Sequence, residues 1–179
     1  MTRTRTAAGG GPAALGALSE DELRSRLHSC CAAEAWVEAI VRGRPYADTA
    51  ELFAASDRAT AALDSGGLAQ ALAGHPRIGE TPAAHGADRR AAAWSHTEQA
   101  GVADADAELR AELAAANAEY ERRFGQVYLV CASGRSAAEL LDLCRSRLAN
   151  DPETERGVVL SELEKINRLR LAKLLESER

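Results

Sequence analysis

The chain is poor in the residues that favour β-strands, and it has no long apolar run. Its 179 residues include 7 Val and 3 Ile against 39 Ala, which favours helices over an extensive sheet. No stretch approaches the roughly 18 apolar residues of a membrane-spanning helix, and the first twenty residues lack the apolar segment of a secretory signal. The net charge of -5 disfavours non-specific nucleic-acid binding. We expect one all-α domain that binds neither membrane nor nucleic acid.

Disulfide and metal frameworks also lack sequence support. The four cysteines, Cys30, Cys31, Cys131 and Cys144, form no C-x-x-C pair, and the histidines are not spaced to complete a zinc site with them. Because no secretion signal is recognisable, we expect a cytoplasmic protein whose four thiols are free and mostly buried. We expect no bound metal.

Several large enzyme classes are disfavoured because their local motifs are missing. The chain has no G-x-x-x-x-G-K-[ST], G-x-G-x-x-G, G-x-S-x-G or H-E-x-x-H, which removes the usual support for phosphate-loop, dinucleotide, nucleophile-elbow and zincin chemistry. The segment 134–136 precedes an expected helix and could bind an anion through free N–H groups. A helix cap explains that segment equally well.

Helical spacing and capping signals predict about eight helices in a single compact domain over residues 18–179, with a long helix at the C-terminus. Ser19 and Ser136 each precede a glutamate by three residues, which is the capping-box pattern. Residues 1–17 carry no periodicity, and we expect them to form a disordered tail. The apolar run 127–132 fits either a buried helical turn or an extended segment. The expected helices span about 19–31, 36–41, 48–64, 68–73, 88–99, 104–124, 136–148 and 151–176.

The closing helix places an arginine beside its apolar face. Leu163, Ile166 and Leu171 recur at helical spacing. Arg170 follows Leu163 by seven residues and therefore lies about 20° from the same line. Its guanidinium either snorkels or pairs with a buried carboxylate, or it binds an anionic or carbonyl-rich ligand.

Two further groups could carry chemistry. Ser95, Glu98 and Gln99 fall on one side of an expected helix, and they either bind a small polar molecule or form a solvated face. His75 precedes Pro76, which biases the histidine away from the α conformation and stiffens its loop. A loop histidine can act as a general acid or base, although a lone histidine is more often an ordinary surface or hydrogen-bonding residue.

Taken in order, six blocks resemble the 2-oxo-4-hydroxy-4-carboxy-5-ureidoimidazoline (OHCU) decarboxylases. Trp36 and Arg44-Pro45-Tyr46 also resemble positions of this family, so the resemblance covers about residues 18–175. The segment 126–128 departs from the more aromatic or proline-containing versions in some members. The six blocks are His-Pro-Arg-Ile-Gly (75–79), Ser-His-Thr-Glu-Gln-Ala-Gly (95–101), Arg-Phe-Gly (123–125), Val-Cys-Ala-Ser-Gly-Arg-Ser (130–136), Arg-Leu-Ala-Asn-Asp (147–151) and Leu-Arg-Leu (169–171).

The resemblance implies an all-helical homodimer without a cofactor. Such an enzyme removes CO2 from the ureidoimidazoline formed after urate oxidation and hydroxyisourate hydrolysis, and it gives (S)-allantoin. The catalytic histidine of the family falls on His75, and Glu98 is expected to assist it. The substrate-binding positions of the family fall on Pro76, Ser95, His96, Thr97, Glu98, Gln99, Gln126, Val127, Tyr128, Leu129, Val130 and Arg170.

These residues suggest a mechanism in which His75 donates a proton to one face of the ring. Glu98 would accept hydrogen bonds from the substrate, Ser95 and Gln99 would fix the ureido arm, and Arg170 would bind a carbonyl and the developing oxyanion. The conjugated ring itself supplies the electron sink, so no cofactor is required. Two alternatives stay open: a non-catalytic helical module that binds a ligand or partner, and a lyase or hydrolase for a related ureido compound. The enzymatic interpretation requires His75, Glu98 and Arg170 to meet at one cavity.

Overall fold

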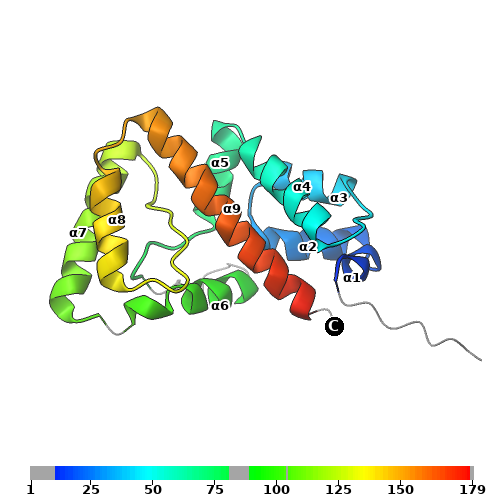
Figure 1. Cartoon of the computed structure of the whole chain (residues 1–179), viewed down its shortest axis with the longest axis horizontal. Coiled ribbons are helices and arrows are strands. Elements are labelled where there is room, and N and C mark those ends of the chain that lie inside the picture. Colours follow the sequence, from blue (N-terminus) through cyan, green and yellow to red (C-terminus); the bar gives the residue numbers. More distant parts are fainter. Residues whose placement is uncertain (1–10, 81–88, 104, 178–179) are drawn as a thin grey trace, which may run out of the picture.

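The computed structural model describes residues 11–80, 89–103 and 105–177. Within these ranges the chain forms nine α-helices and one 3-10 turn and contains no strand (Figure 1), which confirms the all-α prediction. The elements are α1 (Pro12–Gly16), α2 (Glu20–Cys30), α3 (Glu34–Arg42), α4 (Thr49–Ala61), α5 (Ser65–Ala73), α6 (Arg89–Glu98), η1 (Ala100–Val102), α7 (Ala107–Phe124), α8 (Ala137–Arg147) and α9 (Pro152–Ser177).

The helix ends follow the capping signals of the sequence. Ser19 and Ser136 accept hydrogen bonds from the backbone N–H three residues later, and both capping boxes are complete. Asp151 accepts from the N–H groups of Glu153 and Thr154, each at 3.0 Å, and so begins α9. Gly125 ends α7 with a φ of 69°, a left-handed conformation that favours glycine.

Two boundaries differ from the sequence prediction. Residues 12–16 were expected to belong to the disordered tail, but they form α1, and Leu15 is only 3% exposed within the core. Residues 1–10 lie outside the described residues. The helix expected over 48–64 ends at Ala61, and the two glycines expected to end it lie in the first turn of α5. Asp64 causes this change, since its carboxylate accepts from Gly67 N–H at 2.7 Å and caps α5. Asp88 and Asp104, the expected first residues of two helices, are not described.

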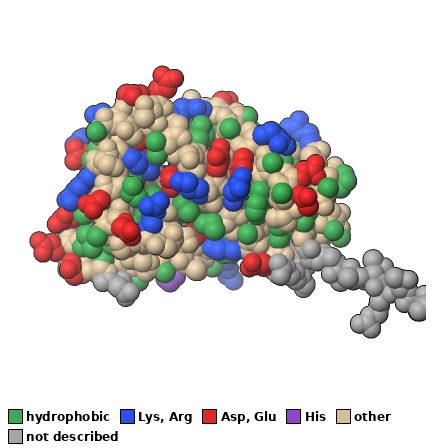
Figure 2. Space-filling model, in the orientation of Figure 1, with side chains coloured by type: hydrophobic (Ala, Val, Ile, Leu, Met, Phe, Trp, Pro, Cys, Tyr) green, Lys and Arg blue, Asp and Glu red, His purple; other side chains and the backbone are tan. Residues whose placement is uncertain are grey.

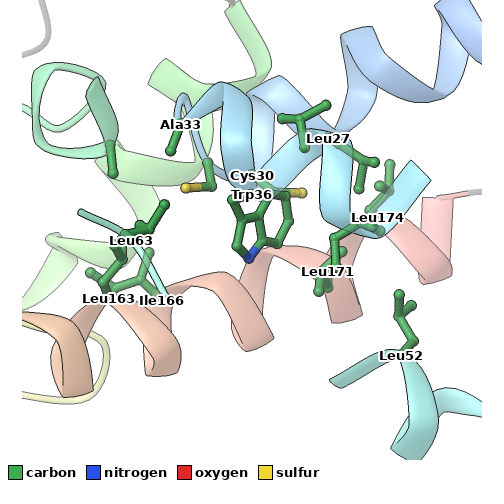
Figure 3. Packing of buried hydrophobic residues seen from close by; sticks show 14 of the residues in the cluster. Leu27, Cys30, Ala33, Trp36, Leu52, Leu63, Leu163, Ile166, Leu171 and Leu174 are labelled. Atoms are coloured by element: carbon green, nitrogen blue, oxygen red, sulfur yellow. The ribbon is translucent and has the colours of Figure 1, made fainter. Parts of the chain in front are cut away.

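Helix α9 runs diagonally through the molecule, with α1 to α4 on one side and α7 and α8 on the other (Figure 1). The first core joins α9 to α2, α3, α4 and α5. Trp36 is fully buried in this core near Leu171 and Leu174 (Figure 3), and its indole N–H donates to Ser56 O and Oγ, both at 3.3 Å. The second core lies between α7 and α8 and includes Tyr120.

The segment 127–132 lies between the two cores and is extended. Val127, Leu129 and Cys131 pack with the first core, whereas Tyr128, Val130 and Ala132 belong to the second. Side chains that alternate between two sides are the signature of an extended chain, since a helix would repeat every 3.6 residues. The extended alternative for this apolar run is therefore the one that the structure supports.

The cysteine prediction is confirmed. All four cysteines are free, three of them are buried, and Cys131 is half-buried. No described helix has the length and apolarity needed to cross a membrane. On the face seen in Figure 2, basic and acidic side chains are interspersed and form no large patch of one sign.

Candidate active site

Four separate segments of the chain meet at one narrow hollow. The hollow lies between the loop after α5, the end of α6, the extended segment 128–132 and α9, and it holds about 20 Å³ of free space, about enough for one water molecule. His75, Glu98 and Arg170 all line it, which is the convergence that the enzymatic interpretation requires. Nine of the predicted site residues line this hollow: His75, Pro76, Ser95, Glu98, Gln99, Tyr128, Leu129, Val130 and Arg170.

Four predicted residues do not line it. His96 and Thr97 are exposed, and the Thr97 hydroxyl donates to Ala93 O at 3.0 Å. Gln126 and Val127 line a different hollow of about 520 Å³ between α5, the end of α7 and the start of α9. That hollow is larger, but the histidine, glutamate and arginine of the expected site are all absent from its lining.

Sequence reasoning missed five residues of the narrow hollow: Ile78, Cys131, Ala132, Ile166 and Leu169. Four of them lie inside blocks that carry the family resemblance, so their neighbours gave a signal for the segment. Ile166 lies on the apolar face of α9 and could be read only as a core residue.

Glu98 and Arg170 form a buried ion pair. Arg170 Nε lies 3.2 Å from Glu98 Oε1, and Arg170 Nη2 lies 2.9 Å from Glu98 Oε2. The same guanidinium donates to Ser95 Oγ at 2.9 Å and to Cys30 O at 3.4 Å. The side chains are only 2% and 9% exposed, so the geometry fixes the orientation of both groups. Arg170 thus pairs with a buried carboxylate, and that carboxylate is the one expected to assist catalysis.

A second cation contacts Glu98. Lys173 Nζ lies 3.3 Å from Glu98 Oε1. Two cations around one carboxylate leave an excess positive charge beside the hollow, which favours an anionic ligand.

His75 is held in an uncharged state. Burial, and secondarily the nearby Arg170 guanidinium, lower the pKa of His75 from 6.5 to about 3. The imidazole is therefore neutral at neutral pH, with one ring nitrogen as donor and the other as acceptor. A negative charge placed in the hollow would reverse this shift, because it would favour the imidazolium form.

The loop that carries His75 is fixed from two sides. Gln99 accepts from Gly79 N–H at 2.9 Å and donates to Arg77 O at 3.4 Å, while Asn117 donates to Ile78 O at 2.8 Å. Gly79 has a φ of 89°, which favours a residue without a side chain. Gln99 therefore supports the loop, and both ends of its amide are occupied.

Among the described residues, no three His, Cys, Asp or Glu side chains gather as a possible metal site.

Comparisons with known proteins agree with the resemblance seen in the sequence. The model of the family described as OHCU decarboxylase matches residues 16–172. The chain is 30% identical over 138 residues to 2-oxo-4-hydroxy-4-carboxy-5-ureidoimidazoline decarboxylase of Amia calva, covering 77% of this chain and 78% of that protein. It is 28% identical over 161 residues to the uric acid degradation bifunctional protein TTL of Arabidopsis thaliana, covering 90% of this chain. The chain spans only 48% of the length of that bifunctional protein.

Two solved structures share the fold. A crystal structure of OHCU decarboxylase in the presence of (S)-allantoin matches with a TM-score of 0.73 and 26% identity, over 89% of this chain and 99% of that one. A crystal structure of (S)-allantoin synthase matches with a TM-score of 0.68 and 17% identity, over 91% of this chain and 53% of that one, and it supports the fold alone. Since the family model covers most of the chain, the chain belongs to the OHCU decarboxylase family.

Proposed function

We propose that this chain decarboxylates 2-oxo-4-hydroxy-4-carboxy-5-ureidoimidazoline to (S)-allantoin and CO2 in urate degradation, without a cofactor. The observation that carries the proposal is the meeting of His75, Glu98 and Arg170 at one hollow. Membership of the OHCU decarboxylase family gives the substrate class.

The chemistry needs a place for an electron pair and a source for one proton. When the ring carbon loses its carboxylate as CO2, the electron pair moves into the conjugated C=N of the ring, so the substrate is its own electron sink. The hydroxyl-bearing carbon ends as a carbonyl, and the neighbouring ring carbon takes up a proton. The net reaction converts one substrate anion and one proton into neutral allantoin and CO2.

His75 supplies that proton. In the free protein the pKa of His75 is about 3, because burial and Arg170 disfavour the charged ring. A bound substrate carboxylate raises the pKa of His75 again, so the imidazole takes up a proton as the substrate binds. His75 then donates this proton to one face of the ring, which makes the product a single enantiomer.

Glu98 and Arg170 supply a rigid, charged wall. Arg170 orients both Glu98 and Ser95 through the hydrogen bonds given above, so these acceptors are already in place when the substrate arrives. The excess positive charge of Arg170 and Lys173 over Glu98 favours the anionic substrate and the charge that develops as the bond breaks. In this arrangement the Gln99 amide holds the His75 loop. The sequence had suggested that Gln99 would instead bind the ureido arm of the substrate.

The extended segment offers main-chain groups to the ureido arm. Val130 lines the hollow, and within residues 11–80, 89–103 and 105–177 no group hydrogen-bonds to its N–H or C=O. A ureido group has both donors and an acceptor, so it can pair with one such peptide edge. The free space of about 20 Å³ is smaller than this substrate, and binding must therefore widen the hollow.

We further propose the homodimer and the cytoplasmic location that the resemblance implies. The four free thiols suit a reducing compartment. Sedimentation equilibrium at micromolar concentration measures the oligomeric state, and a single species of about 19.0 kDa would contradict the dimer.

The test supplies freshly formed substrate from urate oxidation and hydroxyisourate hydrolysis, and it follows the circular dichroism of allantoin. The wild-type protein should speed the appearance of (S)-allantoin over the spontaneous reaction, which gives no excess of one enantiomer. His75→Ala should lower kcat/KM by about 10²–10⁴-fold, the usual contribution of a positioned proton donor. His28→Ala, which changes a histidine on α2 outside the hollow, is the matched control.

The alternatives predict other outcomes. A binding module would bind (S)-allantoin or the substrate without accelerating the reaction. An enzyme for a related ureido compound would leave this substrate untouched and consume allantoin in a parallel assay. Wild-type-like production of (S)-allantoin by His75→Ala would remove His75 from the mechanism.

A further inference from the structure

Among the described residues, no strand lies beside the extended segment 127–132. Buried peptide groups nevertheless need hydrogen-bond partners, and Tyr128, Leu129 and Val130 are each no more than 4% exposed. Side chains from α8 and α9 therefore take the place of a neighbouring strand.

Two of these side chains bind the same edge of the segment. Arg147 Nη1 of α8 donates to Leu129 O at 2.7 Å, and Cys131 N–H donates to Glu162 Oε2 of α9 at 2.8 Å. In an extended chain the N–H and C=O of residues two apart point the same way, and those of the residue between them point to the opposite edge. The groups of Leu129 and Cys131 thus occupy one edge, and Val130 presents the other.

We propose that Glu162 is a positioning residue for the substrate site, because it holds the Cys131 N–H and so turns the free peptide edge of Val130 toward the hollow. This inference rests on the proposed function, in which that edge receives the ureido arm. Glu162 does not line the hollow, so it acts through the segment and not by touching the substrate.

The environment of Glu162 suits a fixed, charged acceptor. The residue is 8% exposed, and Lys165 Nζ lies 2.5 Å from its Oε1, the oxygen that does not bind Cys131. Burial alone would raise the pKa of Glu162, but the hydrogen bonds from Lys165 and from the Cys131 amide offset it, and the net direction is downward. Ionised carboxylates accept shorter and stronger hydrogen bonds than neutral groups. Lys165 therefore occupies Oε1 and leaves Oε2 to accept from the segment.

Arg147 holds the same edge but is a poor test site. Its guanidinium also neutralises the buried carboxylate of Glu155, so its removal would leave a buried charge without a partner and destabilise the whole fold. Glu162 is better suited, since its ion-pair partner Lys165 is 51% exposed.

The experiment compares three variants in the steady-state assay with fresh substrate. Glu162→Met removes the acceptor and should raise KM by about tenfold or more, the usual effect of losing a hydrogen bond to a charged group, while kcat changes less. Glu162→Gln keeps an oxygen that can accept from Cys131 N–H, and it should restore KM to within about threefold of wild type. Lys165→Met removes only the ion pair and should leave KM within about twofold of wild type.

Hydrogen exchange gives a second, activity-independent readout. The Cys131 amide should exchange faster in Glu162→Met and at the wild-type rate in Lys165→Met. If Glu162→Met does not fold by circular dichroism, Glu162→Asp serves instead, because its shorter side chain withdraws the carboxylate from Cys131 but keeps the charge near Lys165.

The outcomes separate the inference from the proposed function. An active wild type with an unchanged KM in the folded Glu162 variants would overturn the positioning role, and so would equal losses in all three variants. A wild type without decarboxylase activity would overturn the proposed function, and the exchange of the Cys131 amide would then still report whether Glu162 holds the segment.

Discussion

Two buried arginine–glutamate pairs in this protein are built from the same parts. Arg170 pairs with Glu98, a serine hydroxyl and a main-chain carbonyl at the narrow hollow. Arg147 pairs with Glu155, the hydroxyl of Tyr120 and the Leu129 carbonyl beside the second core. All four charged side chains are less than 10% exposed.

The pairs differ in what surrounds them. The Glu155 carboxylate is taken up by Arg147, Tyr120 and Asn150, and the Arg147 guanidinium lies 4.9 Å from the Tyr128 ring centroid. That pair is neutral, and Glu155 lines the larger hollow of about 520 Å³ instead of the narrow one. The Arg170–Glu98 pair has an additional cation, Lys173, and shares its hollow with a titratable histidine. A buried ion pair alone therefore does not mark a functional site; an excess charge and a group that exchanges protons beside free space do.

The largest expected effect is the opposite response of the two pairs to the same substitution. Glu155→Gln should lower the free energy of unfolding by about 3–5 kcal/mol, because Arg147 is then buried without a carboxylate. Glu98→Gln should cost less stability, since water in the hollow can solvate Arg170, but should lower kcat/KM by about 100-fold. Urea denaturation and steady-state kinetics on both variants measure the two effects. Equal stability losses, or an active Glu98→Gln, would erase the distinction between the pairs.

This contrast also explains what could be predicted from the sequence. Arg170 was found because it interrupts the apolar face of a long helix, and Glu98 because it shares a helix side with Ser95. Arg147 lies in a polar stretch of α8, and its partners Tyr120 and Glu155 come from two other helices. No local pattern connects these three, so only the packing of α7, α8 and α9 reveals the network.

The site residues were predicted by segment more accurately than by side chain. His96 and Thr97 lie in the same block as Ser95 and Glu98, yet each helical residue turns by about 100°, which carries these two side chains to the exposed face. Gln126 precedes the extended segment and Val127 begins it, both outside the hollow, while Tyr128 to Val130 line the hollow. The path of that segment depends on Arg147 and Glu162, which are distant in sequence.

The second largest expected effect is a pH dependence of stability that comes from His75, the histidine beside the Arg170–Glu98 pair. The pKa of His75 is about 3 in the folded protein and near 6.5 when unfolded. Between these values the unfolded state binds a proton that the folded state does not, so stability falls as the pH drops from about 6.5 toward 3. The maximal slope is about 1.4 kcal/mol per pH unit, and the slope stays below this maximum because the His75 side chain is only half-buried.

Urea denaturation of wild type and His75→Asn at pH 7, 5.5 and 4.5 isolates this contribution. The variant should gain stability relative to wild type as the pH falls. In the same range kcat/KM of the wild type should show no inflection near pH 6.5 and should rise as the pH falls, because the free enzyme holds a neutral His75 that must take up a proton when the substrate binds. A constant stability difference across the three pH values would mean that His75 titrates normally.

The smallest effect tests the excess charge at the hollow. Lys173 is 31% exposed and contacts Glu98 at 3.3 Å, so Lys173→Met should change stability by less than about 1 kcal/mol. Its charge still attracts an anion, and we expect KM to rise about two- to fivefold at low salt while kcat stays near wild type. Arg168 also lies on α9, where it pairs with Asp57 of α4. Arg168→Met removes that cation and should leave KM unchanged. The rise in KM should shrink with added salt, because screening already weakens this attraction in the wild type. A fall in kcat without a change in KM would instead place Lys173 in the chemical step, and the contrast between the two ion pairs would then rest on His75 alone.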